Sequence, residues 1–202
     1  MSRIRSDKRE KRKQRKTKPS ILIAAEGKHL TEKNYFIGFN GYESKYNINF
    51  VSGNETDPIS LVENLNKRWD KDGYSEEFDD LKYVIVDLDN NTAKARVLKN
   101  LINDNQDIRF IISNPCIETW FLFHFEENPK RLNNSKEVIK ELTKYISDYD
   151  KSKNYNAVLY KKTKEAIRNS QNKEKQQELI YEWPDVECNP RSDIHKLVKI
   201  IK

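Results

Sequence analysis

Four short apolar runs, separated by segments with helical spacing, most constrain what this chain can fold into. The run SILIAA at 20–25 is apolar nearly throughout, as expected of a strand buried on both faces. A helical segment follows each run, and parallel strands need crossover connections of this kind. We therefore predict an α/β fold with a mainly parallel sheet flanked by helices. The expected strands are 20–25, 46–51, 81–86 and 107–112, and the helices that follow them are 31–36, 58–69, 92–103 and 117–125.

Several residues mark where these helices should begin. Thr31 is expected to cap the first helix, because its hydroxyl can accept a hydrogen bond from a free backbone N–H. Asp57 should cap the second, with Pro58 at the first helical position. Pro115 is expected to open the fourth helix.

From about residue 133 the pattern is helical and charged. Asn134 or Ser135, with Glu137 close behind, gives a capping signal, and the turn sequence NPRS at 189–192 precedes a last helix. We expect this helical third to pack onto the sheet. The predicted organisation is thus a flexible basic arm at 1–19 and a single α/β domain over 20–202.

The net charge of +6 is concentrated in the arm. The first 18 residues hold ten Lys and Arg residues against Asp7 and Glu10, a net of +8. The arm lacks apolar positions to bury, so we expect it to be disordered until it meets a partner. Contact with nucleic-acid phosphates is one interpretation, and a solubilising tail or a docking arm for another protein is the other. The residues expected to contact nucleic acid are Arg9, Arg12, Lys13, Arg15 and Lys16.

Other features narrow the expected location. The apolar run after the arm reaches Glu26 too soon for a signal peptide, and no run approaches the roughly 20 apolar residues of a membrane span. Cys116 and Cys188 have no metal-type spacing with each other or with the histidines. We therefore expect free thiols and a cytoplasmic protein.

Acidic and polar residues follow three of the predicted strands. Glu26 follows the first, Asp87 and Asp89 the third, and Ser113 with Glu118 the fourth. The carboxyl ends of parallel strands share one edge of a sheet, where ligands gather. Hard oxygen ligands suit Mg²⁺ or Mn²⁺. At the frayed end of a strand, both aspartates can turn toward one ion, which would remove the repulsion between them.

Simpler interpretations of the same residues stay open. Asp and Asn cluster in turns after strands because their side chains bond nearby backbone amides, and Glu26 alone could be a helix cap. His124 fits a structurally hydrogen-bonded histidine better than a site residue. Cys116 has no basic partner at telling spacing and is expected to be a small buried residue.

A set of short motifs extends over nearly the whole chain. SNPCIETWFLFHF at 113–125 is the most specific, whereas EG at 26–27 and the DxD pair at 87–89 are individually weak. With the basic arm, ILIAAEG at 21–27, TE at 31–32, YF at 35–36 and NP at 189–190, they resemble the RloB-like family, which is associated with bacterial restriction loci and abortive phage defence.

The resemblance implies a Toprim-like fold that uses Mg²⁺ to make or break phosphodiester bonds, with Glu26, Asp87 and Asp89 at the metal. Ser113 and Glu118 resemble a further Ser and Glu of related nucleases, although their spacing differs. Such nucleases often pair into homodimers. They also use a later lysine, for which this chain offers Lys151, Lys153, Lys161 or Lys162.

The function expected on this basis is metal-dependent cleavage of RNA, such as tRNA, or of DNA in phage defence. Glu26 or Glu118 would act as general base or second-metal ligand, and the lysine would neutralise the leaving group. The alternative is a non-catalytic subunit of a complex with a separate ATPase, because the chain itself has no GxxxxGK[ST] phosphate loop. A phosphatase with Asp87 as nucleophile is a third, weaker reading, because the customary Thr or Ser spacing is missing.

Overall fold

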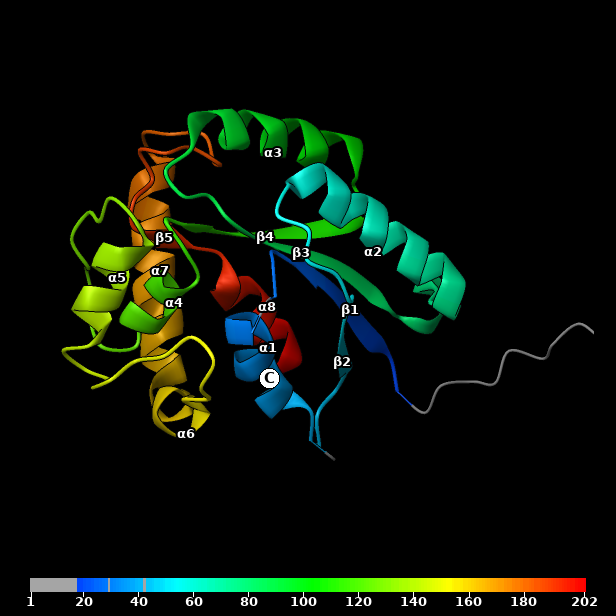
Figure 1. Cartoon of the computed structure of the whole chain (residues 1–202), viewed down its shortest axis with the longest axis horizontal. Coiled ribbons are helices and arrows are strands. Elements are labelled where there is room, and N and C mark those ends of the chain that lie inside the picture. The colour runs from blue at the N-terminus through cyan, green and yellow to red at the C-terminus, as the bar shows by residue number, and fades with distance from the viewer. Residues whose placement is uncertain (1–17, 29, 42) are drawn as a thin grey trace, which may run out of the picture.

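The structure, a computed structural model, describes residues 18–28, 30–41 and 43–202. The five arm residues expected to bind nucleic acid lie outside these ranges. In the described part, five strands form one sheet in the order β2-β1-β3-β4-β5 (Figure 1). The strands are β1 (Ser20–Ala25), β2 (Asn47–Phe50), β3 (Leu81–Asp87), β4 (Ile108–Asn114) and β5 (Arg191–Ser192).

The first four strands are parallel, as the strand-helix alternation predicts. All six residues of β1 are buried, because β1 lies between β2 and β3 and is covered on both faces. Its side chains alternate between two apolar clusters, with Ile21 and Ile23 in one and Leu22 and Ala24 in the other. The continuous apolar run is therefore the signature of a two-sided strand.

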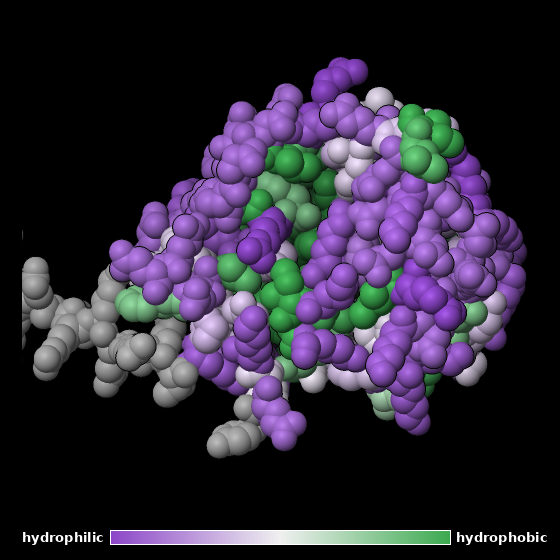
Figure 2. Space-filling model, turned by 180° about the vertical axis from the view of Figure 1, so that it is seen from behind, coloured by the Kyte–Doolittle hydropathy of each residue, from purple (hydrophilic) through white to green (hydrophobic). Residues whose placement is uncertain are grey.

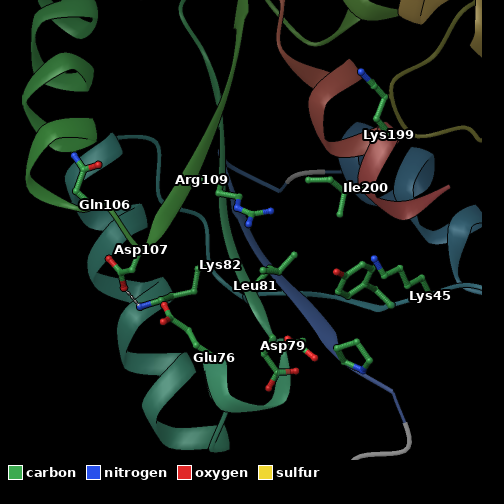
Figure 3. Close-up of a pocket in the computed structure, with 13 residues that line it drawn as sticks. Lys45, Glu76, Asp79, Leu81, Lys82, Gln106, Asp107, Arg109, Lys199 and Ile200 are labelled. Atoms are coloured by element: carbon green, nitrogen blue, oxygen red, sulfur yellow. Dashed lines mark ion pairs between the residues drawn. The ribbon is translucent and has the colours of Figure 1, made fainter.

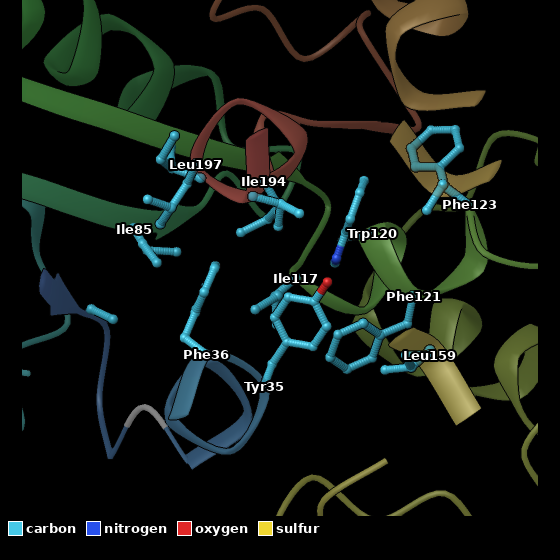
Figure 4. Close-up of a cluster of buried hydrophobic side chains, with 14 of the residues drawn as sticks. Tyr35, Phe36, Ile85, Ile117, Trp120, Phe121, Phe123, Leu159, Ile194 and Leu197 are labelled. Atoms are coloured by element: carbon cyan, nitrogen blue, oxygen red, sulfur yellow. The ribbon is translucent and has the colours of Figure 1, made fainter. Parts of the chain in front are cut away.

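Helices cover both faces of the sheet (Figure 1). On one face, α2 (Pro58–Asp72) and α3 (Thr92–Asp104) contribute Leu61, Leu65 and Leu98 to the apolar cluster. The other face is larger and aromatic, and Tyr35, Phe36, Trp120 and Phe121 converge there (Figure 4). Its helices include α1 (Leu30–Phe36), α4 (Glu118–Leu122) and α8 (Ile194–Ile201).

The capping residues follow the predictions at two helices, where Asp57 and Asn134 accept hydrogen bonds from backbone N–H groups, and differ at two others. Asp57 caps α2 by accepting a hydrogen bond from the backbone N–H of Ser60, and Pro58 begins the helix. Thr31, in contrast, lies inside α1 and is not its cap, because its hydroxyl donates to the carbonyl of Lys151 at 3.3 Å. Pro115 does not begin the fourth helix either: it follows a cis peptide bond, and α4 begins at Glu118.

The C-terminal third is helical, as predicted, except for one short strand. Its remaining helices are α5 (Ser135–Leu142), α6 (Asn156–Leu159) and α7 (Thr163–Glu178). Residues 191–192, expected as part of a turn, instead form β5, which pairs antiparallel with the end of β4. The sheet is therefore mixed, not wholly parallel. A two-residue strand carries too little periodicity to be recognised in a sequence.

A buried arginine anchors β5. The side chain of Arg191 is 1% exposed, and its Nη2 lies 2.9 Å from Glu178 Oε1 and 3.1 Å from Glu174 Oε1. Its guanidinium also lies 4.3 Å from the centre of the Trp183 ring. The strand is thus tied to α7 by charge as well as to β4 by hydrogen bonds.

The face of the described chain drawn in Figure 2 is largely hydrophilic. Figure 2 shows hydrophilic side chains around a hollow in which apolar side chains are visible. Within residues 18–28, 30–41 and 43–202, no helix combines the length and apolar character needed to cross a bilayer.

Candidate acidic site at the strand ends

Acidic side chains from three strand ends lie at one edge of the sheet. Asp87 ends β3 and pairs in register with Ser113 of β4, while Ala25, the residue before Glu26, pairs with Ile85. Glu118 begins α4 after β4. The structure therefore brings the strand-end residues of the sequence analysis together at the carboxyl edge of the sheet, as expected for parallel strands.

A lysine lies between two of these carboxylates. Nζ of Lys94 is 2.6 Å from Oε1 of Glu26 and 3.3 Å from Oδ2 of Asp89. The lysine belongs to the first turn of α3, where the side chain of Asn91 caps the helix by accepting from the backbone N–H of Lys94. In this structure the charge that offsets Glu26 and Asp89 is therefore an ammonium group of the chain itself.

An asparagine network holds the loop that carries Asp89. Asp89 and Asn90 have φ values of 55° and 54°, in the left-handed region that Asn and Asp adopt more readily than most residues. The backbone N–H of Asn90 donates to Asn114 at 3.0 Å, and Asn189 donates to the side chain of Asn90 at 2.6 Å. The interpretation of these residues as a turn and their interpretation as part of a functional site are therefore compatible. The asparagines shape the loop that carries Asp89.

Burial and mutual repulsion raise the pKa of several acids. Burial raises the pKa of Glu26 to about 6, although Lys94 counteracts part of this effect. Burial also raises the pKa of Glu32, on α1, to about 7, with Glu118 adding to the rise. The pKa of Asp87 is raised well above its usual value, first by burial and then by Glu32 and Glu118. Oδ1 of Asp87 is buried without a hydrogen-bond partner among the described residues.

Glu118 lies deepest in the site, with a side chain that is 0% exposed. The hydroxyl of Tyr149 donates to its Oε1 at 3.1 Å, and Nζ of Lys151 lies 3.1 Å from the same atom. Burial opposes the charge on Lys151, but Glu118 outweighs it and raises the lysine's pKa. Oε2 of Glu118 is buried and finds no hydrogen-bond partner in the part of the chain that the structure describes.

Of the four lysines proposed from the sequence, Lys151 forms an ion pair with a site carboxylate. Lys162 instead lies over the ring of Phe125, 5.3 Å from its centre, and Lys161 precedes it in the same 3₁₀ turn, Tyr160–Lys162. Lys153 lines a small depression beside Tyr155 and Asn156.

The remaining sequence candidates have structural partners. The hydroxyl of Ser113 shares a hydrogen bond of 2.8 Å with that of Ser192, so it is engaged inside the sheet. Nδ1 of His124 lies 3.0 Å from the carbonyl oxygen of Trp120, and burial lowers the histidine's pKa to about 4. His124 is thus a buried, hydrogen-bonded residue, as expected. Cys116 is buried beside the acids, and burial raises the pKa of its thiol.

Sequence reasoning missed three residues of this site. Lys94 could have been found, because it lies seven and five residues after the two aspartates and one helical turn from the capping Asn91. Glu32 was recognised only as part of a motif. Tyr149 gave no signal, since its contact with Glu118 spans 31 residues.

The chemistry of these acids suits a divalent metal, but their present arrangement does not form a metal site. Carboxylate oxygens are the ligands that Mg²⁺ prefers, and the unpaired Oδ1 of Asp87 has the character of a free ligand atom. However, within the described residues no group of three His, Cys, Asp or Glu side chains is arranged to hold an ion. Because Lys94 lies between Glu26 and Asp89, a metal bound by these acids requires that lysine to move.

A cavity of about 840 Å³ lies at the opposite, amino-terminal edge of the sheet (Figure 3). The ion pair of Lys82 with Asp107 forms part of its wall, and Arg109 donates to the hydroxyl of Tyr83 at 3.0 Å. These charged groups already have partners within the protein. The cavity is therefore separate from the acidic site and does not include its carboxylates.

The fold and the site define an α/β protein with a mixed, largely parallel sheet and a lysine-bridged acidic cluster at its strand ends. The family model described as RloB-like protein matches residues 21–201, so the chain belongs to the RloB-like protein family. The family resemblance expected from the motifs is confirmed. Neither the curated proteins nor the solved structures gave a match.

Proposed function

We propose that this protein is a metal-dependent nuclease that cleaves phosphodiester bonds, with Glu26, Asp87 and Asp89 as the metal ligands. The observation that carries the proposal is the convergence of buried acids, two of them with an unpaired oxygen, at the carboxyl ends of parallel strands. Repulsion among these acids costs stability, and such a cost is often retained where it serves a site. The Toprim-like relationship remains part of the proposal.

The proposed ligands come from two strand ends. Glu26 and Asp87 are fixed by β1 and β3, whereas Asp89 lies on the loop held by Asn90. A bound Mg²⁺ or Mn²⁺ would supply Lewis-acid polarisation of a phosphate oxygen and a more acidic water. Glu26 is also a candidate for the general base, and Glu118 is the other.

The lysines supply positive charge for a phosphate. Lys151 is about half exposed, with a side chain that is 49% accessible, so its ammonium can face both Glu118 and a bound ligand. In the proposed reaction it stabilises negative charge on the departing oxygen. Glu118 holds Lys151 in place, so we assign Glu118 a positioning role in addition to its proposed role as a base.

The substrate class proposed is nucleic acid, RNA such as tRNA or DNA, in phage defence. The excess of Lys and Arg in residues 1–18 supports this choice, because phosphate contacts dominate nucleic-acid affinity. A separate ATPase is the proposed partner. These assignments rest on the family and on charge.

The test uses purified protein with end-labelled tRNA, mRNA and DNA, in Mg²⁺, in Mn²⁺ and in EDTA. We expect metal-dependent cleavage, and we expect Asp87→Asn to abolish it. Glu63→Gln is the matched control, because Glu63 is an exposed carboxylate on α2, paired with Lys67. Cleavage that survives in Asp87→Asn, or in EDTA, would refute the proposal. Nucleic-acid binding without cleavage, with and without the ATPase, would favour the non-catalytic subunit.

A further inference from the structure

Lys94 occupies the position between two of the proposed metal ligands. Its ammonium group contacts Glu26 and Asp89 at 2.6 and 3.3 Å, and its side chain is only 13% exposed. The cap formed by Asn91 fixes the backbone from which the lysine extends. The long, flexible side chain can nevertheless swing outward, because it begins in the first turn of a surface helix.

The charges around Lys94 are not balanced by it alone. Two buried oxygens of the acidic site, Oδ1 of Asp87 and Oε2 of Glu118, have no hydrogen-bond partner among the residues described. Unpaired buried carboxylate oxygens are costly and point to a missing cation or donor.

We propose that Lys94 is an internal competitor of the divalent cation. It holds Glu26 and Asp89 in the metal-free protein, leaves when the ion binds, and then presents its ammonium to an anionic phosphate at the mouth of the site. This inference rests on the proposed metal dependence, but it concerns a residue with no role in the family resemblance. The ammonium group of Lys94 would thus have one partner set in the metal-free site and another in the metal-bound site.

The direct test measures the reactivity of Lys94 in the wild-type protein. An amine-acylating reagent is applied briefly with and without MnCl₂, and peptide mass spectrometry follows the labelling of each lysine. We expect Mn²⁺ to increase the labelling rate of Lys94 severalfold, because the freed ammonium loses its two carboxylate partners. Lys99, on the same helix and paired with Glu182 at 3.6 Å, is the internal control and should not change. Unchanged or slower labelling of Lys94 in a protein that binds Mn²⁺ would overturn the inference.

The second test uses Lys94→Met and calorimetric titration with Mn²⁺. Removing the competitor should tighten Mn²⁺ binding by up to about fivefold, the factor that corresponds to the loss of a modest ion pair. Lys94→Arg should bind nearly as the wild type, and Lys99→Met is the matched control. If Lys94→Met binds no tighter than the wild type, the inference fails while the proposed nuclease stands. If neither protein binds Mn²⁺, both fail, and tighter binding without any cleavage would remove only the nuclease.

Discussion

The hydroxyl of Tyr149 donates a 3.1 Å hydrogen bond to Oε1 of Glu118, a carboxylate with no solvent exposure. This contact joins the segment after α5 to the first turn of α4. Because Lys151 reaches the same oxygen, one short segment supplies both partners of the most buried acid in the site. The helical third of the chain therefore takes part in building the acidic site.

Replacing Tyr149 with Phe should weaken the fold by leaving Glu118 with one fewer donor. Losing a hydrogen bond to a buried charged group costs about 1–3 kcal/mol. Urea unfolding monitored by circular dichroism would measure the change. Tyr181→Phe, at a half-buried tyrosine outside the site, is the control. Equal stability of Tyr149→Phe and the wild type would show that the hydrogen bond is not maintained in solution.

The caps of α2 and α3 provide a matched pair of variants. Asp57 and Asn91 each accept a hydrogen bond from a backbone N–H in the first helical turn. Changing either to Ala should lower the free energy of unfolding by about 1 kcal/mol. Only Asn91→Ala should also alter Mn²⁺ binding, because Asn91 fixes the turn that carries Lys94. An equal effect of both variants on Mn²⁺ binding would argue against a positioning role for Asn91.

Glu32→Gln should change how stability depends on pH. Since burial raises the pKa of Glu32 from 4.5 to about 7, the folded protein holds this proton while the unfolded chain releases it. Stability of the wild type therefore falls as pH rises from about 4.5 to about 7, by an amount bounded at about 3 kcal/mol for this group. Glu32→Gln should lack that part of the decline. Thermal unfolding of the metal-free proteins at pH 4.5 and pH 8 tests this. An equal change in Tm between the two pH values for the wild type and Glu32→Gln would contradict it.

Arg191→Met should be strongly destabilising. Arg191 is buried against Glu174 and Glu178, and removing one partner of a buried ion pair costs about 3–5 kcal/mol. Arg131→Met is the control, because Arg131 forms a 2.7 Å ion pair with Glu187 in which both side chains are about half exposed. Its loss should cost no more than about 1 kcal/mol. Chemical denaturation of both variants would show whether burial of the ion pair determines how much the free energy of unfolding falls.

The sequence allowed the parallel part of the fold to be predicted because its signals are local. An apolar run shows β1, and the pair of Asp57 and Pro58 marks the start of α2. Strand β5 could not be predicted, since it is two residues long and depends on partners far away in the chain. Thr31 misled for a similar reason: its hydroxyl is taken by Lys151, 120 residues later.

The candidate site shows the same division. The sequence predicts that one edge of the sheet carries Glu26, Asp87 and Asp89. The carboxyl ends of parallel strands lie at the same edge, so only the positions of the strand ends are needed. Which cation lies between them does not follow, because it depends on the direction in which α3 leaves the loop and on the reach of Lys94. The choice of Lys151 among four lysines likewise required the tertiary contact with Glu118.

The hydrogen bond between the hydroxyls of Ser113 and Ser192 bears on the order in which the sheet is assembled. These two residues are 79 positions apart, so the strand beside Asp87 gains its last neighbour only after α7 has been synthesised. Contacts of such long range slow folding, because the chain must close a long loop before they form. A ribosome-bound chain that has produced β1, β3 and β4 therefore still lacks the strand that completes the sheet beside its acidic residues.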